Sequence, residues 1–242
     1  MKKKLWVLAV GAHPDDIEIC CAGTLARYAQ DGHRVFISII CRGNAGTLDK
    51  SVQEIVKIRA EEAQEAANII GAELIMLNFG DAELFYTKEA LEVFIDLVRQ
   101  VKPHVIITHP PEEENMHNDH LLTRRLIMDA SLWATHHNLG MELKYAPVEI
   151  TPSLFYFDQY MSGFNIHPTH YVDITSTFEI KKKALSQHRS QLSFLGKLYG
   201  PNFLEYVEVM ARLRGYQCGV KYAEGFRELA VYPRVRPYRV LP

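Results

Sequence analysis

The chain has 242 residues, 48% hydrophobic and 23% charged, so we expect a single domain over residues 1–242 with a substantial core. Its formal net charge of -2 does not favour nucleic acid or an anionic membrane as a partner. The apolar run after the basic residues 2–4 is too short for a signal peptide, and no run reaches the roughly 18 residues of a membrane span. We therefore expect a cytoplasmic protein. The four cysteines form neither a disulfide framework nor a CxxC zinc motif.

Short apolar runs alternate with helical patterns through the first half of the chain, which predicts an α/β domain with a mainly parallel sheet. Beyond residue 139 the patterns are weaker, and the residues from 232 onward predict an extended tail. We expect strands at 5–10, 34–41, 73–77, 104–108, 152–157 and 170–175. We expect helices at 16–30, 53–70, 89–101, 120–136, 176–191 and 205–215.

The segment "GAHPDD" follows the first predicted strand, where open α/β sheets carry their ligand sites. One interpretation is that Asp15 or Asp16 caps the following helix. The alternative is a site in which His13 takes part. Successive side chains in such a turn diverge, so one aspartate could bind a cation while the other accepts a proton. The absence of GxGxxG from this turn disfavours a nicotinamide enzyme.

A second polar loop, "THPPEEENMHNDH", follows the strand at 104–108. Its glutamates 112–114 are expected to face solvent, and Asp119 could simply cap the next helix. Together with the first loop, however, a histidine here completes a nitrogen and oxygen set of three ligands, the number that catalytic zinc sites use. Asp119 beside His117 also predicts an oriented imidazole that stabilises an oxyanion or protonates a leaving amine.

"AHPDD" combined with "HNDH" at residues 117–120 resembles the PIG-L/LmbE-like zinc-dependent N-deacetylases, which act on N-acetylglucosamine-type substrates. The resemblance implies a Rossmann-like three-layer sandwich with an elaborated C-terminal part. It implies one Zn²⁺ per subunit, or another divalent metal, held by His13, Asp16 and His120. Asp15 is then the general base, and His117, held by Asp119, assists the departing amine.

Four further residues are candidate substrate contacts. The segments "IRAEEAQEAANIIGA", "FGDAEL" and "KKKALSQHRSQ" also resemble family elements and put forward Arg59, Asp81 and His188. The alternatives are an ion pair of Arg59 with a glutamate of its own helix and a packed or surface His188. The segment "CRGNAG" departs from the family pattern, and its Arg42 is a candidate either for an anionic substrate group or for a surface salt bridge.

The sequence thus predicts a hydrolase that removes the N-acetyl group from an N-acetylglucosamine-type sugar or conjugate. The alternatives are a related zinc amidase for another N-acyl or thiol-sugar conjugate, and a metal-binding protein without catalysis. The partner expected is a small-molecule amino sugar. The resemblance also implies a homo-oligomer, a trimer or hexamer.

Overall fold

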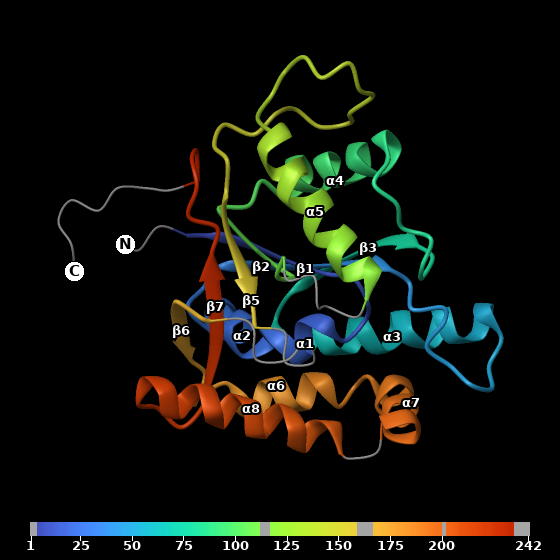
Figure 1. The fold of residues 1–242 in the computed structure, drawn as a ribbon, viewed down its shortest axis with the longest axis vertical. Coiled ribbons are helices and arrows are strands. Elements are labelled where there is room, and N and C mark those ends of the chain that lie inside the picture. Colours follow the sequence, from blue (N-terminus) through green and yellow to red (C-terminus); the bar gives the residue numbers. More distant parts are fainter. Residues whose placement is uncertain (1–3, 112–116, 159–166, 200–201, 235–242) are drawn as a thin grey trace.

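The computed structural model describes residues 4–111, 117–158, 167–199 and 202–234. Within these residues, seven strands form one sheet in the order β3-β2-β1-β4-β5-β7-β6 (Figure 1). The strands are β1 Trp6–Gly11, β2 Arg34–Cys41, β3 Glu73–Phe79, β4 Val105–Thr108, β5 Ser153–Phe157, β6 His170–Asp173 and β7 Ala223–Glu228.

The sheet is parallel from β3 to β5, whereas β7 runs antiparallel to β5 and β6 runs antiparallel to β7. The expectation of a mainly parallel sheet is therefore confirmed. Strand β7 was not expected. Its sequence "AEGFRE" lacks an apolar alternation, and its buried Glu224 is accommodated by partners from distant parts of the chain.

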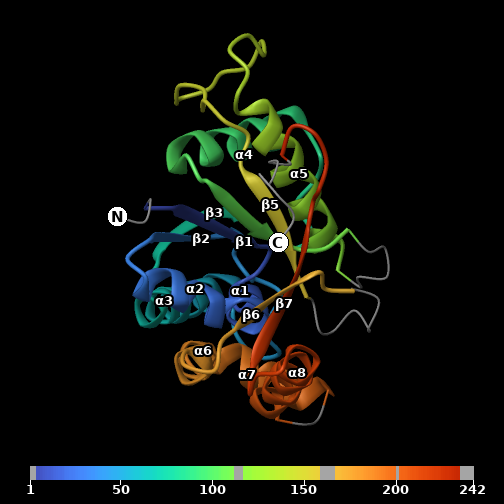
Figure 2. The same cartoon turned by 90° about the vertical axis from the view of Figure 1, so that its left-hand side faces the viewer.

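Helices cover both faces of the sheet (Figures 1 and 2). One face packs against α4 and α5, and the other against α1 to α3, beyond which α6 to α8 are stacked. The helices are α1 Asp16–Cys20, α2 Ala22–Gln30, α3 Val52–Ile70, α4 Lys88–Val101, α5 Asn118–Trp133, α6 Phe178–Leu185, α7 Arg189–Tyr199 and α8 Phe203–Cys218. The two aliphatic cores on either side of the sheet make the three-layer arrangement that was expected.

The single helix predicted at 16–30 is wrong, because the chain breaks at Cys21 into α1 and α2. Buried polar groups from the C-terminal part satisfy the backbone at this break. Lys181 donates to the carbonyl of Ile19 in α1, and the Glu224 carboxylate accepts from the amides of Gly23 and Thr24 in α2. A sequence pattern within residues 16–30 cannot reveal partners that lie 150 or more residues away.

The single helix predicted at 176–191 is also wrong, since α6 ends at Leu185 and α7 begins at Arg189. The turn between them carries His188, whose side chain is fully buried against Glu18 of α1. The other elements agree with their predicted ranges to within a few residues. The tail from 235 and the glutamates 112–114 lie outside the described residues.

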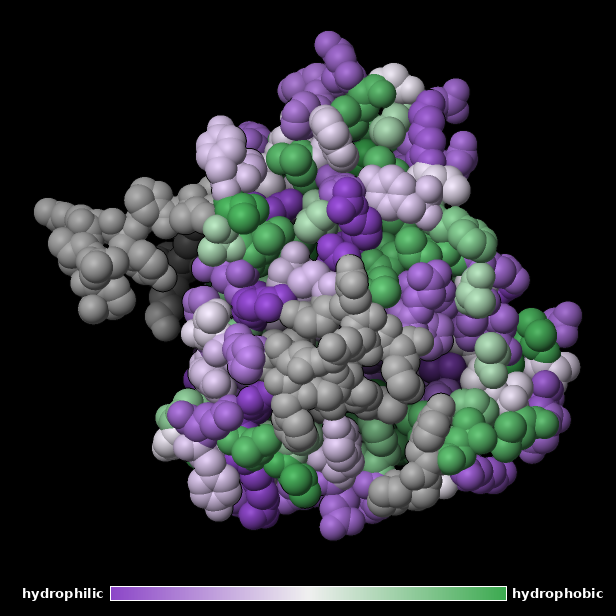
Figure 3. Space-filling model, viewed as in Figure 1, coloured by the Kyte–Doolittle hydropathy of each residue, from purple (hydrophilic) through white to green (hydrophobic). Residues whose placement is uncertain are grey.

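The parallel strands bring the loops that follow β1, β2, β3 and β4 to one edge of the sheet, as their shared direction requires. No helix in the described ranges is long and apolar enough to cross a membrane. The face seen in Figure 3 mixes hydrophilic residues with smaller groups of hydrophobic ones.

Candidate metal centre

Six predicted residues meet at the carboxyl edge of the sheet. His13, Asp15 and Asp16 lie between β1 and the start of α1, and β1 pairs in parallel with β4. The other three come from the start of α5, where His117 is the N-cap residue and Asp119 and His120 lie in the first turn. The two loops therefore form one site, although about a hundred residues separate them along the chain.

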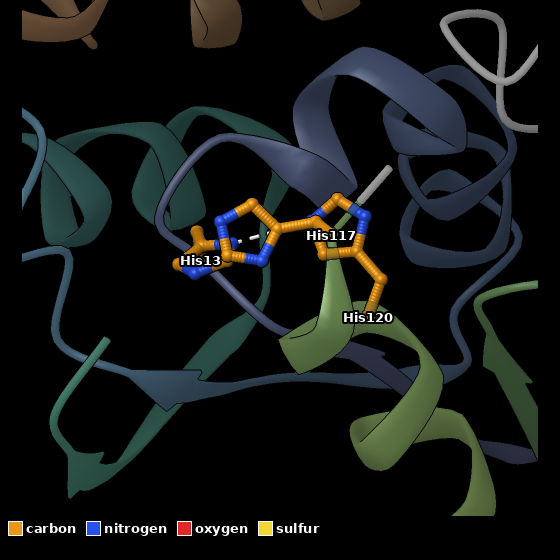
Figure 4. A group of neighbouring side chains, drawn as sticks. All are labelled: His13, His117 and His120. Carbon is orange, nitrogen blue, oxygen red and sulfur yellow. Dashed lines mark hydrogen bonds between the residues drawn. The ribbon is translucent and has the colours of Figure 1, made fainter. Parts of the chain in front are cut away.

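Three side chains of this site have donor atoms that are spaced like metal ligands. His13 Nδ1 lies 3.2 Å from His120 Nε2 and 3.8 Å from Asp16 Oδ2. Asp16 Oδ1 lies 3.3 Å from His120 Nε2. Ligand atoms at about 2.0–2.1 Å from a tetrahedral metal ion stand roughly 3.3 Å apart, so the residues fit a divalent cation. Figure 4 shows the rings of His13 and His120 joined by a hydrogen bond, with His117 alongside.

Asp16 is held as an anion. Burial raises its pKa, but the neighbouring His120 and His109 outweigh that effect and keep the pKa well below its usual range. The carboxylate also accepts the backbone N–H of His13 at 2.7 Å, so its position is fixed from inside the same turn. A fixed, charged carboxylate beside two imidazoles is a suitable ligand set for a metal ion.

Asp15 stands apart from this donor set. It is the N-cap residue of α1, yet its side chain makes no capping hydrogen bond, so the capping interpretation is wrong for Asp15. Its backbone has a φ of 126°, a strained value for a residue with a side chain, of the kind that clusters at functional sites. Burial raises the pKa of Asp15 to about 6, although the charge of Arg59 opposes the shift.

Arg59 reaches the site from α3 and is only 3% exposed. Its Nη2 donates to the carbonyl of Pro14 at 2.6 Å, and its Nη1 donates to that of Gly43 at 3.2 Å. Gly43 has a φ of 74°, and a Cβ there would lie 2.6 Å from the guanidinium, so this turn requires glycine. The guanidinium thus ties the turns after β1 and β2 together rather than pairing with a glutamate of its own helix.

Asp119 lies between two histidines. Its Oδ2 is 3.2 Å from His13 Nε2 and 3.7 Å from His117 Nδ1, and it accepts the N–H of Ala82 at 2.9 Å. The carboxylate is fully buried, whereas the His117 side chain is 49% exposed. Sequence reasoning paired Asp119 with His117, but the structure places it nearer to His13.

The remaining candidates occupy different positions around the site. Asp81 accepts the N–H groups of Gly43 and Ala45, both at 2.8 Å, and so joins the loops after β3 and β2. Arg42 is half-buried, and its Nε donates to Asn44 Oδ1 at 3.5 Å; no ion pair of its guanidinium lies within the described residues. His188 has no exposed surface, and its Nε2 lies 3.2 Å from Glu18 Oε2, in agreement with the packed alternative.

Sequence reasoning did not single out His109, the residue directly after β4. It is fully buried, its Nε2 lies 3.3 Å from Asp16 Oδ2, and its ring stacks on that of His120 with centroids 4.2 Å apart. Asp16, His109 and His120 form a further group with metal-ligand spacing. The position of His109 at the carboxyl end of a strand is the signal that could have identified it.

A mainly parallel α/β fold with a histidine and aspartate cluster at its carboxyl edge defines an α/β protein whose cluster could hold a metal ion. Residues 8–131 match the family model described as "PIG-L: GlcNAc-PI de-N-acetylase", and the chain belongs to the PIG-L family. It is 30% identical to the diacetylchitobiose deacetylase of Thermococcus kodakarensis, covering 91% of this chain and 82% of that protein.

Solved structures agree with this assignment. The N,N'-diacetylchitobiose deacetylase of Pyrococcus horikoshii superposes with a TM-score of 0.81 at 27% identity, over 92% of this chain and 83% of that one. The fold also occurs in a protein with another reaction. The 4-carboxy-2-hydroxymuconate hydratase GalB of Pseudomonas putida gives a TM-score of 0.80 at 23% identity, over 97% of this chain and 99% of that one.

Proposed function

We propose that this protein is a zinc-dependent hydrolase that removes the N-acetyl group from an N-acetylglucosamine-type sugar or sugar conjugate. The observation that carries the proposal is the division of the carboxyl edge into a metal-ligand set and a separate, strained carboxylate, Asp15. The similarity to the deacetylases supports the same reaction.

His13, Asp16 and His120 would hold one Zn²⁺, or another divalent ion, through the donor atoms that stand 3.2–3.8 Å apart. When bound, such an ion polarises a carbonyl and lowers the pKa of water. Three protein ligands leave a coordination position open, as catalytic zinc sites require. The further carboxylate of Asp15, which makes no capping hydrogen bond beside this ligand set, favours catalysis over metal binding alone.

The proton transfers fall to two residues of the chain. Asp15 takes a proton from the attacking water as the oxygen bonds to the acetamide carbon. His117, half-exposed at the rim, donates a proton to the amine nitrogen as the carbon–nitrogen bond breaks. The products are acetate and the free amino sugar, so atoms and charge balance without a further reactant.

The four candidate substrate contacts have different roles in this proposal. Within the described residues, the Arg42 guanidinium donates only to Asn44 Oδ1, so it could contact a substrate group beyond the acetamide. Asp81 shapes the wall by holding the loop at 43–45, and Arg59 braces the turn that carries Asp15. His188 is buried beside Glu18 of α1, so in this proposal its effect on the site is indirect.

A panel of acyl sugars tests the function. The purified, zinc-loaded protein should release amine and acetate from N-acetylglucosamine, diacetylchitobiose or a related conjugate. If amine is released only from substrates with larger acyl groups or from thiol-sugar conjugates, the protein is the related amidase and not an N-acetyl hydrolase. Because a relative of this fold is a hydratase, an unsaturated carboxylic acid belongs in the panel. Its hydration without amine release would overturn the proposal.

We further propose that the chain is one deacetylase domain over residues 1–242, located in the cytoplasm and assembled as a trimer or hexamer. The molar mass measured by light scattering during size-exclusion chromatography tests the assembly. A monomer mass would contradict it. Limited proteolysis tests the single domain, because a second domain would survive as a stable fragment.

A further inference from the structure

The two ring nitrogens of His13 face different partners. Nδ1 faces the donor atoms of His120 and Asp16, where the proposed metal lies. Nε2 faces away from them, toward Asp119 Oδ2 at 3.2 Å. We infer that Asp119 is a positioning residue for the metal ligand His13, holding its ring in the form that binds a cation through Nδ1. This inference rests on the proposed metal site.

The chemistry of imidazole explains why the contact of Nε2 with Asp119 determines what Nδ1 can bind. A neutral imidazole carries one N–H and one lone pair, on different nitrogens. An ionised carboxylate only accepts hydrogen bonds, so Asp119 requires the N–H on Nε2 and leaves the lone pair on Nδ1. A carboxylate behind a ligating histidine orients the ring and strengthens the ligand in many metal sites.

The carboxylate is itself held in place. Asp119 is fully buried near the start of α5, and its Oδ2 accepts the N–H of Ala82 at 2.9 Å. Ala82 has a φ of 61°, in the left-handed region, which turns its N–H toward the site. The loop after β3 therefore supports the ligand that follows β1, with Asp119 as the connection.

His117 is the competing partner for the same oxygen. Its Nδ1 lies 3.7 Å from Asp119 Oδ2, half an ångström further than His13 Nε2, and its side chain is 49% exposed against 10% for His13. A hydrogen bond to the more buried ring at the shorter distance contributes more. The geometry thus favours a role for Asp119 in metal binding over a role limited to orienting His117.

Zinc affinity, measured by chelator competition, tests the inference without any substrate. We expect Asp119→Ala to weaken Zn²⁺ binding about 10- to 100-fold, the usual loss for a supporting partner. Asp119→Asn should lose less, because an amide oxygen can still accept from Nε2. Circular dichroism and thermal unfolding of the zinc-free proteins check that each variant is folded.

The decisive comparison places Asp119→Ala in a His117→Ala background. The same 10- to 100-fold loss in both backgrounds supports the inference. Zinc binding by Asp119→Ala within twofold of the unsubstituted protein would overturn it, as would a loss that disappears when His117 is already absent. A protein that releases no amine but shows this pattern of zinc affinity would refute the proposed function alone.

Discussion

Arg59 Nη2 lies 3.7 Å from Asp15 Oδ1 and donates at 2.6 Å to the carbonyl of Pro14, the residue just before it. One side chain from α3 therefore braces both the backbone and the carboxylate of the strained turn. The charge of Arg59 also opposes the effect of burial on the Asp15 pKa. The orientation of the proposed general base thus depends on a helix that supplies no metal ligand.

Replacing Arg59 should damage the turn without removing a ligand. In Arg59→Met, two backbone carbonyls lose their donor and Asp15 loses its cation, so we expect about 2–5 kcal/mol of destabilisation in urea unfolding. The turnover number should fall, and Arg59→Lys should restore part of both losses. Arg189→Met is the matched control, because its ion pair with Glu65 is exposed and worth about 1 kcal/mol or less. Equal effects at the two positions would contradict the bracing role.

Asp15→Asn should separate catalysis from metal binding. The amide has nearly the same shape but cannot accept the proton, so we expect turnover to fall about 10²- to 10⁴-fold. Zinc content, measured by mass spectrometry of the dialysed protein, should stay at one ion per chain. Turnover close to that of the unsubstituted protein would show that another group is the base.

His120→Ala removes a proposed ligand, since His120 Nε2 lies within 3.3 Å of donor atoms from both His13 and Asp16. We expect the variant to lose its zinc during dialysis and to lose activity with it. The control is His136→Ala, at an exposed histidine that follows the C-terminal end of α5, and it should retain both zinc and activity. Full zinc occupancy of His120→Ala would exclude this residue from the ligand set.

The fully buried pair of Lys181 and Glu224 should dominate the stability of the α1–α2 break. Lys181→Met leaves the Glu224 carboxylate buried without its cation, so we expect a loss of about 3–5 kcal/mol in urea unfolding. The double variant Lys181→Met/Glu224→Gln should recover part of that loss, because the neutral amide can still accept from α2.

The control for this pair is Lys57→Met, which breaks an exposed ion pair with Glu61 and should change stability by about 0.5 kcal/mol or less. If Lys181→Met lowered the free energy of unfolding by no more than this control, the buried pair would not be what stabilises the α1–α2 break.

The central strands β1, β2 and β4 could be predicted from local pattern because they are buried on both faces and read as nearly continuous apolar runs. The helix breaks at Cys21 and before Arg189 could not be predicted from local pattern. Each break is stabilised by buried polar groups that come from distant elements, such as Glu224 at the first and Glu18 at the second. Periodicity reports which face of a helix is apolar, and carries no information about such partners.

The sequence by itself determined the α/β class and the two polar loops of the site, because strand direction brings loops after parallel strands to one edge. It also determined that His13, Asp16 and His120 are of the residue types a zinc ion prefers. Only the tertiary structure decided that Nδ1 of His13 faces His120 and Asp16 and that Asp119 lies beside Nε2. It also decided that His188 is buried. Side-chain orientation follows from packing between distant segments, and that packing is absent from any local stretch of sequence.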